Sequence, residues 1–180
     1  MFRASRPQIT VSPVVSAPGL RCPVPPFRHV RGGRTAEVSV EPVAVPMVGR
    51  TVWTLWVTRR RVHLLFHPDG RRFRVHGLPL DTPQCVLRVF FNEGVLAAFD
   101  VLSLHGDASV SEEPFASVRH PQLRATLGRH LEVVDIYKWF EPDLIPKTCV
   151  GRLYLAANRR ACALPVLVLA AKRRGDLLYL

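Results

Sequence analysis

The sequence predicts an α+β fold built on an antiparallel sheet with one or two helices. Strand-like stretches follow one another from residue 51 onward and are separated by turn residues rather than by helices. One stretch with Leu123, Leu127 and Leu131 at intervals of four interrupts this series and predicts a helix with a single apolar stripe. A chain of 180 residues with 48% apolar content is long enough for one domain with a substantial core.

The expected strands either are rich in β-branched and aromatic residues or alternate apolar with polar ones. They are Thr51–Val57, Arg61–His67, Arg71–Gly77, Cys85–Phe91, Val95–Leu104, Glu132–Phe140 and Leu164–Ala171. Asp69–Gly70 is a pair that favours a tight hairpin turn, and Asn92–Gly94 joins the next two strands. Gly151–Ala161 is interpreted as a short second helix.

The first part of the chain differs in composition from the rest. Residues 1–45 hold seven of the 16 prolines and alternate them with Val, Ser and Arg. Because proline removes a backbone donor and blocks helix, this segment is expected to be an extended, flexible leader. Residues 46–180 are then the folded domain.

The formal net charge of +11, from 25 basic and 14 acidic residues, is the strongest compositional signal. Such a charge favours RNA, nucleotides or an acidic partner protein. The basic residues are almost all arginines, since the chain has only three lysines, Lys138, Lys147 and Lys172. A GC-rich coding sequence with arginines on solvated faces is the alternative explanation.

The four cysteines are Cys22, Cys85, Cys149 and Cys162, and none forms a C-x-x-C pair. This spacing favours neither zinc nor a disulfide framework, so a reducing intracellular compartment is expected, either nucleus or cytoplasm. No apolar run approaches the roughly 18 residues of a membrane span, and no membrane partner is expected.

Several motifs, taken in order, resemble the nucleotidyltransferase domain of mRNA capping guanylyltransferases and ATP-dependent polynucleotide ligases. The segment Phe99–Arg119 is similar to the family's strand ending in Phe/Tyr-Asp-Ile/Val-Leu, followed by a polar link and an arginine that opens a helix. The segment Arg61–Asp81 resembles the hairpin between the family's lysine and Asp-Gly-Glu motifs. Glu132–Phe140 resembles a strand that presents a lysine, here Lys138. The resemblance covers roughly residues 46–172 and implies a nucleotidyltransferase-like core without the OB-fold domain.

The same resemblance implies that the family's chemistry is absent. The family forms a lysyl-nucleotide while carboxylates hold a metal. At the lysine motif, Pro46 stands for the lysine, Val48 for the aspartate and Thr51 for the arginine. At the carboxylate motifs, Arg88–Phe90 replaces Asp-Gly-Glu, and Leu164 replaces the later aspartate. The expected protein is therefore a pseudoenzyme that needs no cofactor or metal.

Two residual forms of chemistry are the alternatives to a pseudoenzyme. The stretch "HPDGRR" (His67–Arg72) approximates a lysine motif with histidine as nucleophile, but its spacing to Asp100 favours a plain hairpin turn. Asp100 and Asp107 with Glu112 and Glu113 form an acidic cluster, interpreted mainly as a solvated loop rather than a metal site.

The residues expected to bind nucleic acid or nucleotide are arginines near the hairpin, one tryptophan and one lysine. They are Arg59, Arg60, Arg61, Arg71, Arg72, Arg74, Trp56 and Lys138. Arginine beside aromatic residues combines contact to the phosphate backbone with base stacking. Trp53 and Trp56 are expected on opposite faces of their strand, so that one sheet face buries only one of them. Three functions remain open: a non-catalytic RNA- or nucleotide-binding or partner-docking module, a basic assembly scaffold for an acidic partner or packaged nucleic acid, and a residual nucleotidyltransferase acting through His67 or Lys138.

Overall fold

The computed structural model describes residues 8–14, 29–31, 35–39, 43–49, 51–66, 71–138, 151–155, 166–170 and 177–179. In this part of the chain the fold is mixed α+β, with a mostly antiparallel seven-stranded sheet and one α-helix. The expected fold class is confirmed at this level. None of the helices in the described ranges has the length and apolar character needed to cross a bilayer.

The seven-stranded sheet contains most of the strands that the sequence predicts. Its order is β1 (Thr10–Pro13), β7 (Arg71–His76), β6 (Val62–Phe66), β5 (Val52–Val57), β8 (Cys85–Asn92), β9 (Val95–Leu104) and β10 (Glu132–Val133). All neighbours are antiparallel except β10, which runs parallel to β9. The arms of the expected hairpin, β6 and β7, pair with Phe66 opposite Arg71. The turn His67–Gly70 itself lies outside the described residues.

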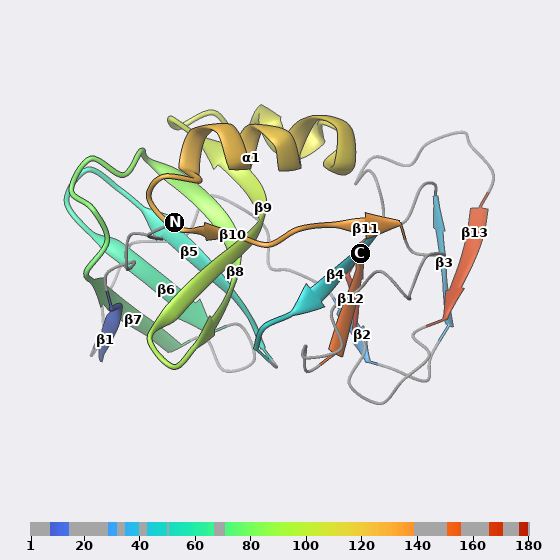
Figure 1. The fold of residues 1–180 in the computed structure, drawn as a ribbon, viewed down its shortest axis with the longest axis horizontal. Coiled ribbons are helices and arrows are strands. Elements are labelled where there is room, and N and C mark those ends of the chain that lie inside the picture. The colour runs from blue at the N-terminus through green and yellow to red at the C-terminus, as the bar shows by residue number, and fades with distance from the viewer. Residues whose placement is uncertain are drawn as a thin grey trace, which may run out of the picture.

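A second, five-stranded sheet lies on the right of Figure 1. Its order is β11 (Tyr137–Lys138), β4 (Val43–Met47), β12 (Gly151–Leu155), β14 (Leu177–Tyr179) and β2 (His29–Arg31). A pair of strands, β3 (Thr35–Ser39) and β13 (Val166–Ala170), stands beside it in the same view. The expected strand Glu132–Phe140 is thus divided between the two sheets as β10 and β11, and residues 139 and 140 are not described.

The short helix expected at Gly151–Ala161 is wrong over Gly151–Leu155, because these residues form β12, paired with β4 on one side and β14 on the other. Parts of the expected leader lie in strands, and the boundary expected at residue 46 falls inside β4, whose five residues are all buried. The rest of the leader, apart from residues 8, 9 and 14, lies outside the described residues.

The single helix α1 (His120–Leu127) follows a 3₁₀ turn, η1 (Ala108–Glu112), and a π-helical turn, η2 (Phe115–Arg119). It lies across one face of the larger sheet (Figure 1). The expected stripe is confirmed for Leu123 and Leu127, which lie on this helix, whereas Leu131 follows its end; all three are buried in the core on that face. On the opposite face, a second core joins β4 to the sheet through Val45, Met47, Phe90 and Phe99.

Candidate nucleic-acid interface

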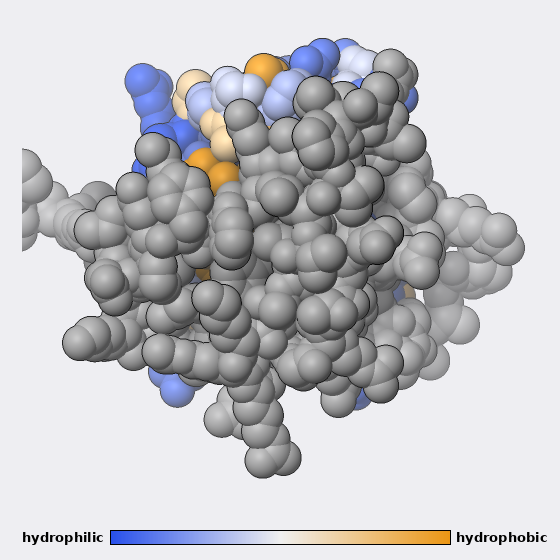
Figure 2. All heavy atoms as spheres, turned by 90° about the vertical axis from the view of Figure 1, so that its right-hand side faces the viewer, coloured by the Kyte–Doolittle hydropathy of each residue, from blue (hydrophilic) through white to orange (hydrophobic). Residues whose placement is uncertain are grey.

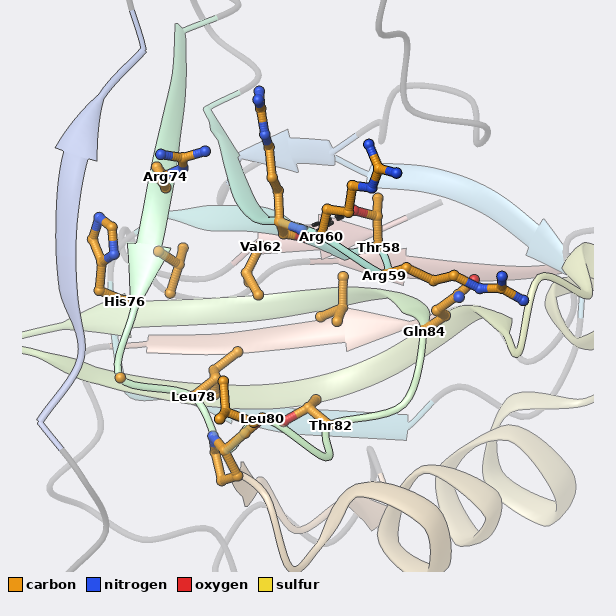
Figure 3. A pocket seen from close by; sticks show the side chains of 15 residues that line it. Thr58, Arg59, Arg60, Val62, Arg74, His76, Leu78, Leu80, Thr82 and Gln84 are labelled. Carbon is orange, nitrogen blue, oxygen red and sulfur yellow. Dashed lines mark hydrogen bonds between the residues drawn. The ribbon is translucent and has the colours of Figure 1, made fainter.

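A pocket of about 830 Å³ opens at one end of the seven-stranded sheet. The sheet order explains its position. The chain leaves β7 at His76 and crosses the ends of β6 and β5 before it enters β8. The crossing loop, Gly77–Gln84, therefore faces the turn between β5 and β6, and the pocket lies between them (Figure 3).

The turn between β5 and β6 is fixed by one threonine. The Thr58 backbone N–H donates to the Arg61 carbonyl at 2.9 Å, and the Arg61 N–H donates to Thr58 Oγ1 at 3.1 Å. These bonds close the turn and leave Arg59 and Arg60 exposed at its tip. Figure 3 shows both side chains extending from the turn, in different directions.

The opposite side of the pocket is apolar and locally ordered. Leu78, Pro79 and Leu80 belong to the crossing loop, and Leu80 is fully exposed. Thr82 Oγ1 donates to the Pro79 carbonyl at 2.6 Å and holds this part of the loop in a turn. The pocket therefore has a guanidinium side and an aliphatic side.

Five basic side chains line the pocket, and the lining includes no aspartate or glutamate. They are Arg59, Arg60, Arg61, Arg74 and His76. The positive field reaches the neighbouring strand: burial lowers the pKa of His63, and the charges of Arg72, Arg61 and Arg74 lower it further. Basic side chains without a carboxylate make the lining of this pocket electropositive. Within the described ranges, no group of three or more His, Cys, Asp or Glu side chains is placed to hold a metal.

The structure brings four of the eight expected binding residues, Arg59, Arg60, Arg61 and Arg74, into this pocket. Arg71 lies on the other face of β7, with its guanidinium 5.9 Å from the Phe73 ring centroid. Lys138 lies on β11 in the second sheet, opposite Val43. Neither residue is part of the pocket.

The two tryptophans point to opposite faces of β5, as expected. Trp53 packs against the helix-covered core, with its ring 5.8 Å from that of Phe73. Trp56 lies 5.8 Å from the His63 ring, and the Arg72 guanidinium lies 5.9 Å from the Trp56 ring centroid. Arg72 and Trp56 thus form a cation–π pair beside the pocket and are not among its lining residues.

Sequence reasoning missed His76 and the aliphatic side of the pocket. His76 alternates with Arg72 and Arg74 along β7, which is the signal that would have included it. The crossing loop carried no comparable signal, because its place depends on β8 pairing with β5.

The acidic cluster does not converge. Asp107, Glu112 and Glu113 are exposed, whereas Asp100 is fully buried and paired with Arg119. The described residues visible along the upper margin of Figure 2 are mixed hydrophilic and hydrophobic.

Comparison with protein-family models gives no match for this sequence, and comparison with curated proteins gives none either. The fold and the site alone define the chain as a mixed α+β protein with an arginine-lined pocket at one end of its larger sheet.

Proposed function

We propose that this chain is a non-catalytic, guanylyltransferase-like module that binds RNA or a nucleotide through phosphate groups in the arginine pocket. The observation that carries the proposal is that Arg59, Arg60, Arg61 and Arg74 line one pocket whose lining has no carboxylate. A volume of about 830 Å³ is within the range of small-molecule and cofactor sites.

Guanidinium groups suit this ligand because they present several donors in a planar fork that matches phosphate oxygens. The aliphatic side formed by Leu78, Pro79 and Leu80 offers a surface for a sugar or a base edge. Trp56 lies outside the pocket, so we expect phosphate contact to contribute more to affinity than stacking.

The lining residues also support binding without catalysis. They include no lysine, cysteine or carboxylate that would act as nucleophile or metal ligand. Pro46, which the resemblance places at the position of the family's nucleophilic lysine, is the fourth of the five buried residues of β4.

The binding test is fluorescence anisotropy with a labelled single-stranded RNA of about 12 nucleotides across a salt series. In the variant Arg59→Ala/Arg60→Ala we expect weaker binding and a salt slope, log K against log [salt], smaller by about 1.4, since each single-strand phosphate contact contributes about 0.7. The matched control is Arg124→Ala/Arg129→Ala, which removes the same charge from exposed residues beyond the pocket. Equal losses in both variants would mean that net charge, not the pocket, binds RNA.

A second candidate is the assembly scaffold, favoured by the fully exposed Leu80 beside the arginines. An acidic segment with an apolar residue would satisfy both sides of the pocket. Tight binding of a Glu- and Leu-containing peptide, with no affinity for RNA at physiological salt, would establish this function instead.

The third open function, a residual nucleotidyltransferase, has its own test. After incubation with radiolabelled GTP or ATP and Mg²⁺, we expect no covalently labelled protein. A label that disappears in His67→Ala or Lys138→Ala would overturn the non-catalytic assignment.

A further inference from the structure

Ser12 lies on the outermost strand of the larger sheet, beside the strand that supplies two basic residues to the pocket. β1 pairs only with β7 in the described sheet, with Ser12 opposite Arg74 and Thr10 opposite His76. The Ser12 Oγ lies 3.3 Å from His76 Nε2, within hydrogen-bonding distance. The Ser12 side chain is exposed.

Strand geometry places the serine among cations. Directly opposed residues of an antiparallel pair share a face, and so do residues two apart on one strand. Ser12 therefore shares its face with Arg72, Arg74 and His76, and neither β1 nor β7 contains an acidic residue. Arg72 leans over Trp56, which leaves Arg74, directly opposite Ser12, and His76, two residues further along β7, as the basic side chains beside Ser12.

The Arg74 guanidinium is available for a new partner. Its side chain makes no hydrogen bond or ion pair with the residues that the structure describes, and it is exposed. A dianionic group on Ser12 would find one guanidinium and one imidazole within reach, without disturbing the apolar core on the opposite side of β7.

The sequence next to Ser12 distinguishes it from other hydroxyls. The chain has two hydroxyl residues followed by proline, Ser12 before Pro13 and Thr82 before Pro83, a pair that proline-directed protein kinases recognise in extended segments. Thr82 is half-buried, and its hydroxyl donates to the Pro79 carbonyl. Ser12 is exposed on an extended edge strand.

We propose that Ser12 is a phosphorylation site and that Arg74 and His76 hold its phosphate. A proline-directed kinase transfers the γ-phosphoryl group of ATP: the Ser12 Oγ–P bond forms, the bond from Pγ to the bridging oxygen breaks, ADP leaves, and the hydroxyl proton passes to the kinase's catalytic base. The phosphate carries roughly −1.5 to −2 charge and three acceptor oxygens, and opposite arginine it forms one to three charge-assisted hydrogen bonds.

Two consequences follow. The phosphate fastens β1 to β7, where the Ile9 N–H to Gly94 carbonyl bond of 2.9 Å and the Val14 N–H to Arg72 carbonyl bond of 3.0 Å already flank the strand. It also engages Arg74, which lines the pocket, and so lowers the affinity of the pocket for an anionic ligand. This second consequence rests on the proposed function; the first does not.

The test compares the full chain carrying genetically encoded phosphoserine at position 12 with the unmodified chain. Amide hydrogen exchange of Thr10–Ser12 should slow by up to about fivefold, because an ion pair between exposed groups contributes at most about 1 kcal/mol. Phosphoserine at the exposed Ser117 adds the same charge away from β7 and should leave β1 exchange unchanged. In Arg74→Ala/His76→Ala the effect of phosphoserine 12 should disappear.

RNA-binding measurements on the same proteins distinguish the proposed phosphosite from the proposed function. Phosphoserine 12 should weaken RNA binding several-fold, and Arg74→Ala should remove this difference. Slower β1 exchange with no RNA affinity in either form would reject the proposed function and leave the phosphosite standing. Unchanged or faster β1 exchange, or slowing that persists in Arg74→Ala/His76→Ala, would overturn the phosphosite.

Discussion

Arg119 and Asp100 form a two-point ion pair in the interior of the protein. Arg119 Nε donates to Asp100 Oδ1 at 2.9 Å, and Arg119 Nη2 donates to Asp100 Oδ2 at 3.2 Å. The two side chains are 1% and 0% exposed. The remaining Arg119 nitrogen, Nη1, donates to the carbonyls of Ser111 and Glu113. Through these hydrogen bonds, the Arg119 guanidinium links the middle of β9 to η1 and to η2, the turn that precedes α1.

Removal of Arg119 should be strongly destabilising, because it leaves the Asp100 carboxylate buried without its partner. We expect Arg119→Ala to lower the free energy of unfolding by about 3–5 kcal/mol, measured by urea denaturation. The matched control is Arg124→Ala, which breaks the exposed Arg124–Asp135 pair and should cost about 0–1 kcal/mol. Similar losses in the two variants would contradict a special role for the buried pair.

Stability should decrease as the pH falls below the ordinary range of histidine. Burial lowers the pKa of His63, and burial likewise lowers the pKa of His120, whose Nε2 lies 2.7 Å from the Val134 carbonyl. The unfolded chain then binds protons that the folded chain does not, so stability is greatest above pH 6.5 and is lost as the pH falls toward the folded-state values. Urea midpoints at pH 8, 7, 6 and 5 measure this.

Two histidine variants test whether His63 and His120 cause the decline of stability at low pH. His63→Gln and His120→Gln should each flatten the decline between pH 7 and pH 5, even if either lowers stability at pH 8. A decline of the same size in both variants and in the unmodified chain would show that other groups cause it.

The part of the fold that the sequence predicted is the part encoded locally. Cys85–Phe91, Val95–Leu104 and the leucine stripe have short-range patterns that match a strand or a helix by themselves. The sequence predicts a helix at Gly151–Leu155 instead of the observed strand, because the partners of this strand, β4 and β14, lie far from it in sequence. Propensity alone does not contain such long-range pairing.

The candidate site likewise has a part that could be predicted from the sequence and a part that could not. Arg59, Arg60, Arg61 and Arg74 could be grouped in advance because β6 and β7 form one hairpin. Their position opposite Leu80 could not be predicted, because it depends on the chain passing from β7 over the ends of β6 and β5. The Asp100–Arg119 pair joins residues 19 apart, and the available signal was a charge in the middle of an apolar strand.

Cys85 should be unreactive in the folded protein. It is 3% exposed at the start of β8, and burial raises the pKa of its thiol to about 12, so almost no thiolate forms near neutral pH. Iodoacetamide at pH 8, followed by peptide mass spectrometry, should leave Cys85 unmodified in buffer and modify it in 8 M urea, a concentration chosen to unfold most domains. Rapid modification in buffer would show that the β8 end of the core opens readily.

Gly77 fixes the point where the chain leaves β7 and begins the loop over the pocket. Its φ is +103°, which side chains rarely adopt, and a Cβ there would lie 2.6 Å from the Gln8 carbonyl oxygen. Gly106 has a similar φ of +82°, but a Cβ on it would meet nothing within 4 Å. A comparison of alanine variants at the two glycines therefore distinguishes the free-energy cost of a strained φ from the added cost of a Cβ collision.

Gly106→Ala should lower the free energy of unfolding by about 1–2 kcal/mol, the usual cost of a side chain in the left-handed region. Gly77→Ala should cost more, because the collision involves backbone and is relieved only if Gln8 moves away. Since Gln8 leads directly into β1, we also expect faster amide exchange at Thr10–Ser12 in Gly77→Ala and no change there in Gly106→Ala. Equal costs, with β1 exchange unaffected in both variants, would mean that the N-terminal strand does not pack against the start of the crossing loop.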